Sequence, residues 1–285
     1  MKCSPFLFLI LTLIYCTNTN AQTGSLKKKW TNMLDADLTK WEKFIGVPHT
    51  SLELEGYPKG DGMKGIPIGL NKDPLNVFST IQENGETVLK ITGQIYGALS
   101  TKEDYSNYHL KLQFKWGEKK YAPRLTAKRD NGLLYHGTGP HGAFWNVWMR
   151  SNEMQVQEAD MGDYYALAGA KSSIPVIKDT DKLWLYTPKA PLVEVTRAKQ
   201  RGGIEKPNGE WNTLELICID DKSLHIVNGK VVNVLNNSRI TVDGKDIKLT
   251  NGKIQIQSEG AEAYYKNIQI KAIKKYPSEY LKQIE

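Results

Sequence analysis

The residues best suited to chemistry lie in the middle of the chain, in a short run that reads EMQVQ from Glu153 to Gln157. Successive side chains of an extended strand point to opposite faces, so Glu153, Gln155 and Gln157 share one face while Met154 and Val156 share the other. Carboxylate and amide groups suit sugar hydroxyls, because together they supply hydrogen-bond donors and acceptors. The run therefore predicts a polar row that binds a sugar. The alternative is a strand with one solvated face.

Two residues of this region have the chemistry of a proton-transfer pair. His136 and Glu153 are the candidates for base and acid, because both side-chain types exchange protons in catalysis. Arg150 is a candidate for stabilising a developing oxyanion. His136 has the same strand parity as the apolar Leu134. The alternative for His136 is therefore a histidine packed beside the core.

The same region offers groups that could hold a sugar. Gln155 and Gln157 are predicted to bind hydroxyls, and Asn131 is a further candidate. Trp145 and Trp148 could present flat apolar surfaces to the C–H faces of pyranose rings. A single indole is more often part of the core, so this interpretation stays open.

Three acidic residues beyond the polar run are candidate metal ligands. Glu158, Asp160 and Asp163 offer hard oxygen ligands of the kind that a divalent cation such as Ca²⁺ prefers. Acidic residues in turns are also commonly just solvated, which leaves both interpretations open. A divalent cation is the one cofactor for which the sequence suggests ligands.

Strand patterns with a period of two dominate the rest of the chain and must position these groups. They predict an all-β protein in which two antiparallel sheets pack face to face. Apolar strand positions give the predicted core, which includes Leu110, Leu112, Phe114, Leu216 and Ile256.

Turn signals and long irregular segments divide these strands. Asn228 and Gly229 predict a tight hairpin, because both residue types tolerate positive φ. Two segments, Glu55–Pro74 and Ala166–Gly209, contain several prolines and are predicted to be long loops around a functional site. Helix is expected only near Ser278–Gln283.

The start of the chain predicts a secretory signal peptide over residues 1–21. Lys2 supplies the positive charge, Phe6–Tyr15 is mostly apolar, and the small Ala21 precedes the expected cut. The apolar run is about ten residues long, too short for the roughly 20 that cross a bilayer. The protein is therefore expected to be secreted or periplasmic. Lipid anchoring at Cys16 is the alternative.

Composition limits the remaining function classes. Residues 22–285 are predicted to form a single β-sandwich domain with Cys218 as its only cysteine, so no internal disulfide can form. The formal net charge is +7, but the lysines are scattered, which indicates solubility and not a nucleic-acid partner. No segment of the mature chain is predicted to span a membrane.

An ordered set of motifs resembles one known family. The motifs are NGLLYH (131–136), WMRSNEMQ (148–155), GD (162–163), GEWN (209–212), GKIQIQ (252–257) and YKNI (265–268). Their order and spacing are similar to those of the 3-keto-disaccharide hydrolase domain family, common in gut Bacteroidetes, over roughly Trp30 to Ile273. Lys266 stands where the family often has arginine, which is a conservative departure.

The resemblance implies a concanavalin A-like jelly-roll β-sandwich, export, and an enzyme that cleaves glycosides already oxidised to a ketone at C3. Such a carbonyl acidifies the proton on C2, so a base can remove it and the C1 leaving group can depart by elimination. Elimination and net hydrolysis both remain open. The expected partner is an oligosaccharide or another glycoside.

Two other functions remain open. Laminarinase-type glycoside hydrolases need two carboxyl groups about 5–5.5 or 6.5–9.5 Å apart. Glu153 and Glu158 would lie about 16 Å apart in a regular strand and face opposite ways. Such an enzyme would have to recruit a carboxylate such as Glu259 from a neighbouring strand. A non-catalytic carbohydrate-binding module would show aromatic platforms without a base, and His136 and Glu153 argue weakly against it.

Overall fold

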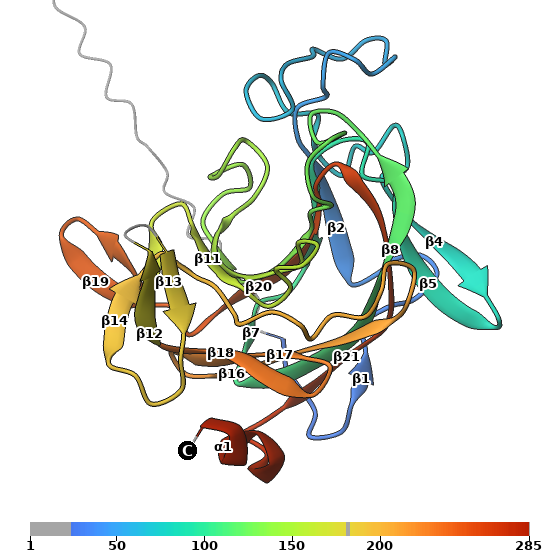
Figure 1. Cartoon of the computed structure of the whole chain (residues 1–285). Helices are drawn as coiled ribbons and strands as arrows, with labels where there is room; N and C mark the ends of the chain where they lie inside the picture. The colour runs from blue at the N-terminus through green and yellow to red at the C-terminus, as the bar shows by residue number, and fades with distance from the viewer. Residues whose placement is uncertain (1–23, 181–182, 285) are drawn as a thin grey trace, which may run out of the picture.

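Two large antiparallel sheets face each other in the computed structural model, which describes residues 24–180 and 183–284 (Figure 1). The predicted signal peptide and Cys16 lie outside these described residues. Within them the only helix is α1 (Ser278–Ile284), at the position where the sequence predicted a short one. No helix in this part of the chain is long and apolar enough to cross a membrane.

The larger sheet has twelve strands. Its main path runs β13 (Leu183–Tyr186), β12 (Ala170–Thr180), β18 (Lys230–Val242), β17 (Lys222–Val227), β16 (Asn212–Ile219), β8 (Tyr108–Lys120), β21 (Ala261–Ala272), β5 (Glu86–Ile91) and β4 (Phe78–Glu83). Three short strands extend it: β1 (Thr31–Asn32) pairs with β21, β14 (Leu192–Val195) with β12, and β19 (Lys245–Lys248) with β18.

The smaller sheet has nine strands and carries the candidate site. Its path runs β15 (Arg197–Ala198), β11 (Tyr164–Leu167), β10 (Arg150–Gln155), β9 (Gly132–Thr138), β20 (Asn251–Ser258), β6 (Gly97–Thr101), β2 (Trp41–Ile45) and β3 (Gly69–Leu70), and β7 (Tyr105–Ser106) pairs with β20. In Figure 1 the loops that follow β9 and β2 rise from this sheet on the side away from the larger sheet.

The core lies between the sheets, where period-two alternation places it. All five predicted core residues, Leu110, Leu112, Phe114, Leu216 and Ile256, are buried there in one cluster. The predicted fold, an all-β concanavalin A-like jelly-roll sandwich of two antiparallel sheets, is confirmed. A separate patch on the outer face of the larger sheet is covered by α1 through Tyr280.

The hairpin prediction is confirmed, whereas one loop prediction is wrong. Asn228 and Gly229 connect β17 to β18 with φ values of 49° and 80°. The segment Ala166–Gly209 is not a long loop, because it contains β12, β13, β14 and β15. β13 is the edge strand of the larger sheet, and β12 lies next to it. Pro175 is accommodated because it lies beyond the residues of β12 that pair with β18 and faces only Leu192 of β14. Glu55–Pro74 does form a long irregular segment, interrupted only by β3.

Candidate active site

A polar floor is built by the register of three adjacent strands of the smaller sheet. The central strand β9 pairs with β10 on one side and β20 on the other. Gln155 lies opposite Gly132, and Glu153 lies opposite Leu134. From the other side, Gln255 also lies opposite Leu134. These residues face away from the core, because the intervening positions of all three strands are buried between the sheets.

The floor continues one row further, beyond the ends of β9 and β20. Asp130 and Glu259 form an antiparallel bridge there. Gln157 Nε2 donates a hydrogen bond of 2.6 Å to Asp130 Oδ2. Successive rows are two residues apart, which is about 6.6–6.8 Å along a strand. Polar side chains from three strands therefore cover one continuous surface.

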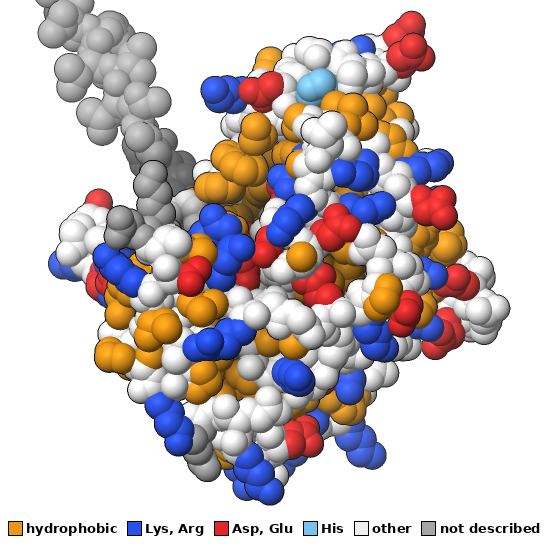
Figure 2. Space-filling view, in the orientation of Figure 1, with side chains coloured by type: hydrophobic (Ala, Val, Ile, Leu, Met, Phe, Trp, Pro, Cys, Tyr) orange, Lys and Arg blue, Asp and Glu red, His pale blue; other side chains and the backbone are white. Residues whose placement is uncertain are grey.

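This floor lies under a cavity with a volume of about 240 Å³. Its polar lining comprises Arg124, Asp130, Glu153, Gln155, Gln157, Gln257 and Glu259, and its apolar lining comprises Phe144, Trp145, Trp148, Tyr165, Ala166 and Leu167. The space-filling view shows acidic and basic side chains close to a ridge of apolar ones on the upper part of the molecule (Figure 2). The cavity therefore combines titratable groups with aromatic surface.

Arg124 joins two of the carboxyl groups. Its guanidinium lies 2.5 Å from Asp130 Oδ2 and 3.2 Å from Glu259 Oε1. Burial raises the pKa of Asp130 to about 6, against the opposing effects of Arg124 and of the hydrogen bond from Gln157. Burial and the neighbouring Asp130 raise the pKa of Glu259 well above its usual range. At neutral pH, Asp130 is therefore the ionised member of the pair and Glu259 the protonated one.

Glu153 is the third carboxyl group of the cavity. Burial, followed by the charge of Asp130, raises the pKa of Glu153 well above its usual range, so the site favours the neutral acid form of Glu153. Gly132 makes room for it, because a Cβ at this position would overlap Oε1 of both Glu153 and Gln257. Gln257 Oε1 is buried and has no hydrogen-bond partner among residues 24–180 and 183–284. The floor therefore holds one proton donor and one free acceptor side by side.

Aromatic side chains form the other part of the cavity. Trp148 is 1% exposed, and its Nε1 donates a hydrogen bond of 3.0 Å to the Gly97 carbonyl. Trp145 is 43% exposed and stacks on Phe144 with ring centroids 4.8 Å apart. Trp148 is thus fixed within the protein, whereas Trp145 packs against Phe144 and Trp148 and remains partly exposed at the cavity.

The structure brings five of the sequence-predicted site residues into this cavity, namely Glu153, Gln155, Gln157, Trp145 and Trp148. It does not bring His136 there. His136 is buried, and its ring packs edge-on against Tyr135 and Tyr108 at centroid distances of 5.4 and 6.0 Å. The reason is a bulge, since β9 has one residue more than β10 and β20 at this point and His136 adopts φ 53°. Burial lowers its pKa to about 4.

Asn131 and Arg150 are also placed outside the cavity lining. Asn131 lies below the floor, where its Nδ2 donates to the Gln257 carbonyl at 2.7 Å and its Oδ1 accepts from Tyr265 at 2.6 Å. Arg150 Nε donates to the Ala168 carbonyl at 2.8 Å. In these positions Asn131 supports the strands of the floor and Arg150 fixes the turn after β11.

The three predicted metal ligands are separated by cations. Asp160 contacts Lys128 and Lys199 at 2.7 and 3.1 Å, and Glu158 pairs with Arg129 at 3.1 Å. Asp163 accepts a hydrogen bond of 2.8 Å from Gln200 N, and burial raises its pKa to about 7. In the part of the chain that the structure describes, no group of three or more His, Cys, Asp or Glu side chains is placed to hold a metal ion. This donor set therefore does not fit Ca²⁺.

Three polar residues that line the cavity, Arg124, Asp130 and Gln257, were not among the site residues predicted from the sequence. Arg124 and Asp130 come from the segment between β8 and β9, which has no strand periodicity. Gln257 belongs to the motif GKIQIQ, whose alternation of Gln255 and Gln257 with isoleucines was the available signal. For Glu259, the sequence suggests only the role of a carboxylate that a conventional glycosidase would recruit.

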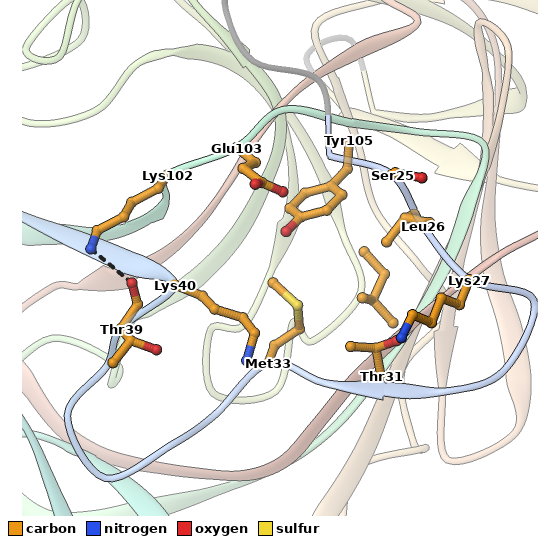
Figure 3. A pocket seen from close by; sticks show the side chains of 11 residues that line it. Ser25, Leu26, Lys27, Thr31, Met33, Thr39, Lys40, Lys102, Glu103 and Tyr105 are labelled. Carbon is orange, nitrogen blue, oxygen red and sulfur yellow. Dashed lines mark hydrogen bonds between the residues drawn. The ribbon is translucent and has the colours of Figure 1, made fainter.

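A second cavity, of about 270 Å³, lies beside the N-terminal segment (Figure 3). Its charged lining consists of three lysines and Glu103, and Lys102 Nζ donates to the Thr39 carbonyl at 2.7 Å. Tyr105, Met33 and other apolar side chains fill the remainder. With a single carboxyl group, this cavity offers no acid–base pair, so the chemistry belongs to the cavity above the smaller sheet.

Comparison with known proteins gives one family. The family described as "3-keto-alpha-glucoside-1,2-lyase-like domain" matches residues 29–271. No curated protein matches the chain.

The solved structures that are similar to this chain include the following three. A protein of Parabacteroides distasonis ATCC 8503, provisionally named a glycosyl hydrolase, is 19% identical with a TM-score of 0.49, covering 86% of this chain and 94% of its own. The Bacillus licheniformis β-glucanase is 12% identical with a TM-score of 0.44, covering 88% of this chain and 99% of its own. The carbohydrate-binding module CBM66 of Bacillus subtilis is 6% identical with a TM-score of 0.42, covering 68% of this chain and 92% of its own. At these identities the likeness concerns the fold alone.

Proposed function

The chain belongs to the 3-keto-alpha-glucoside-1,2-lyase-like domain family of glycoside hydrolase-like, carbohydrate-active proteins, and from this premise we propose that it cleaves 3-keto-glycosides. Cleavage begins with removal of the C2 proton and ends with loss of the C1 substituent. The observation that carries the proposal is the carboxyl arrangement: Asp130, in contact with Arg124, shares one cavity with Glu153 and Glu259, whose pKa values are raised by burial.

Asp130 is the base in this proposal. Its pKa of about 6 lies close to neutral pH, which is where a general base combines ionisation with useful proton affinity. Arg124, at 2.5 Å, keeps it ionised despite burial. When Asp130 takes the C2 proton, the electron pair of the C2–H bond passes into the carbonyl system, and an enolate forms with its charge on the C3 oxygen.

Glu153 stabilises that enolate. A neutral carboxylic acid in a buried site can donate a strong hydrogen bond to a developing oxyanion. The enolate then collapses, so that the C3 carbonyl is restored, a C1=C2 double bond forms and the bond from C1 to the leaving oxygen breaks. The leaving oxygen takes the proton held by Glu259. Asp130 returns its proton to Glu259 across their contact, and both groups regain their starting states.

Conventional glycoside hydrolysis is the second candidate, because one specific observation favours it. Glu259, directly after β20, lines the same cavity as Glu153. A pair of carboxyl groups is what such an enzyme requires. However, the pKa values of both are raised well above the usual range, so neither supplies the carboxylate that this mechanism needs at neutral pH.

The test compares matched glucosides that differ only at C3. We expect turnover with the 3-keto-glucoside and negligible turnover with the parent glucoside, since only the ketone acidifies the C2 proton. Equal activity on both would contradict the proposal and favour a conventional glycosidase. Binding of both without turnover would favour a carbohydrate-binding module.

Export is a further part of the proposal. Residues 1–21 have the pattern of a secretory signal peptide, which places the enzyme where it meets external glycosides. Mass spectrometry of the natural protein should then find Gln22 at the N-terminus. An acylated Cys16 at the N-terminus would show lipid anchoring instead.

A further inference from the structure

The cavity has two chemically different ends along the strands of its floor. Asp130 and Glu259 occupy one row, and Leu134, four residues after Asp130 in the chain, lies on β9 two rows further along. Those two rows correspond to about 13 Å of strand. Leu134 packs in one apolar cluster with Trp148 and Leu167. Asp130 and Glu259 therefore lie at one end of the cavity, and the aromatic and aliphatic side chains lie toward the other. Glu153, which is paired opposite Leu134, reaches back toward Gly132 between the two ends.

Trp145 presents its ring at the apolar end. The loop that carries it is closed by backbone hydrogen bonds between Phe144 and Trp148, and Val147 N donates to the Phe144 carbonyl at 3.0 Å. This encloses Trp145 and Asn146 as the two central residues of a tight turn, with φ values of 52° and 57°. Positive φ at both positions defines a type I′ turn, which strongly favours Asn and Gly.

A tryptophan at the first central position of such a turn is unfavourable for folding. Bulky side chains rarely adopt the left-handed region, and residues held there tend to cluster at functional sites. Burial of the ring does not offset the cost of this backbone conformation, since 43% of Trp145 remains exposed. Asn146 fixes the loop from outside by donating a hydrogen bond of 2.8 Å to the Met63 carbonyl. The loop thus holds an exposed indole in a set position at the cavity.

The size of the cavity places this indole next to the leaving group. A volume of about 240 Å³ corresponds to roughly eight water molecules at their share of liquid volume. This is room for about one sugar ring, with its C1 substituent reaching the partly exposed Trp145 at the edge of the cavity. The ring that loses its C2 proton must lie against Asp130, at the polar end. The substituent on C1 then has to extend toward the apolar end and Trp145.

We propose that the apolar end holds the leaving group of the substrate, and that this group is a flat aromatic ring stacked on Trp145 and not a second sugar. This inference rests on the proposed function for the orientation of the substrate. A second sugar could stack on Trp145 through its C–H face, but the hydroxyl groups at its edge would lie against Phe144, Trp148 and Leu167. These side chains offer no free hydrogen-bond partner, since Trp148 Nε1 already donates to the Gly97 carbonyl. An aromatic ring has no such requirement and gains stacking contacts. The substrate class is therefore the 3-keto-glycosides of aromatic alcohols.

The test measures binding, which does not depend on turnover. The probes are the phenyl glucoside, the methyl glucoside and a glucosyl glucoside, all unoxidised and of one anomer, titrated calorimetrically into the full protein. The wild type should bind the phenyl glucoside about tenfold more tightly than the methyl glucoside. Trp145→Asn should abolish that difference without lowering the melting temperature, since asparagine suits the turn. Trp145→Phe should retain most of the preference for the phenyl glucoside.

Leu192→Ala is the matched control, because Leu192 is also exposed and apolar but lies on β14, outside the cavity. It should leave all three affinities unchanged. A larger loss for the glucosyl glucoside than for the phenyl glucoside in Trp145→Asn would overturn the proposal in favour of a second sugar. Equal affinity of the wild type for all three probes would overturn it as well. Failure of the proposed function would appear separately, as absence of turnover of 3-keto-glucosides with the phenyl preference intact.

Discussion

Asp130 and Glu259 lie directly opposite each other on neighbouring strand segments, and the Arg124 guanidinium contacts both carboxyl groups. One cation cannot fully compensate two buried carboxylates, so one carboxyl group keeps its proton. The pair thus contains a base and an acid in direct contact. The proposed elimination uses this relationship, because one group must take a proton from C2 and another must give a proton to the leaving oxygen.

The first prediction concerns the acidic limb of the pH profile. Asp130 acts as a base only when ionised, and its pKa is about 6. We expect kcat/KM on a 3-keto-glucoside to fall as the pH decreases through about 6, because protonation removes the base. Asp130→Asn should lower kcat/KM by about 10²–10⁴ at neutral pH, the usual contribution of a positioned acid or base. Retained activity with an unchanged acidic limb would show that Asp130 is not the base.

The second prediction concerns Arg124. Replacing it by methionine removes the nearby positive charge that opposes the effect of burial on Asp130, so the pKa of Asp130 should rise further. The acidic limb of the kcat/KM profile should then move to higher pH. Arg124→Lys, which keeps the charge, should move it less. If both variants show the wild-type limb, then Arg124 does not set the ionisation of the base.

The third prediction separates stability from activity at Glu153. Its raised pKa means that the folded protein keeps a proton which the unfolded chain releases above pH about 4.3. Stability therefore falls as the pH rises above that value. Glu153→Gln should remove this effect and raise the melting temperature at pH 7 by a few degrees, and the gain should disappear near pH 4. Its activity should fall by about 10²–10⁴.

Glu215 provides the opposite control for this experiment. Burial alone would raise its pKa, but hydrogen bonds from His109 and Tyr280 lower it overall. The folded state therefore favours the Glu215 carboxylate, and this stabilisation is present above the unfolded pKa and lost as the pH falls. Glu215→Gln should lower the melting temperature at pH 7. The same direction of change in both variants would contradict the assigned protonation of Glu153.

The fourth prediction concerns the space that Gly132 leaves open. A Cβ at this position would overlap Oε1 of Glu153 and of Gln257, so Gly132→Ala must displace both side chains from the cavity floor. We expect Gly132→Ala to lower kcat strongly and to lower the melting temperature only slightly. Gly137→Ala on the same strand is the comparison, because the nearest atom to its Cβ would be the Lys253 carbonyl oxygen, 3.2 Å away. Equal effects of the two substitutions on kcat would show that the displaced groups are not needed.

The sequence predicted the sheets and half of the cavity for a simple physical reason. Alternation along EMQVQ separates Glu153 and Gln155 from Met154, which is buried in the core. A strand with one buried face cannot slip by one residue without exposing its apolar side chains. The polar face of β10 was therefore predictable from hydrophobic patterning alone.

The remainder of the cavity could not be read from periodicity. His136 has the parity of Leu134, but the bulge in β9 breaks this relation and directs its ring toward Tyr108. Bulges insert one residue and leave no clear signal in an alternating pattern. Arg124 and Asp130 come from an irregular segment, and only the folded register brings them next to Glu259. Similarly, the separation of Asp160 from Glu158 by lysine and arginine side chains depends on long-range contacts.

The fate of the hydrogen on C2 tests the central claim most directly. A 3-keto-glucoside labelled with deuterium at C2 is cleaved in ordinary water, and the sugar product is analysed by mass spectrometry, with unreacted substrate and an incubation with Asp130→Asn as controls for spontaneous exchange. Elimination removes the deuterium from C2 before the bond between C1 and the leaving oxygen breaks. The sugar product should therefore contain no deuterium, while the unreacted substrate keeps its label. A product that retains the deuterium would show direct displacement at C1 and would contradict the mechanism proposed here.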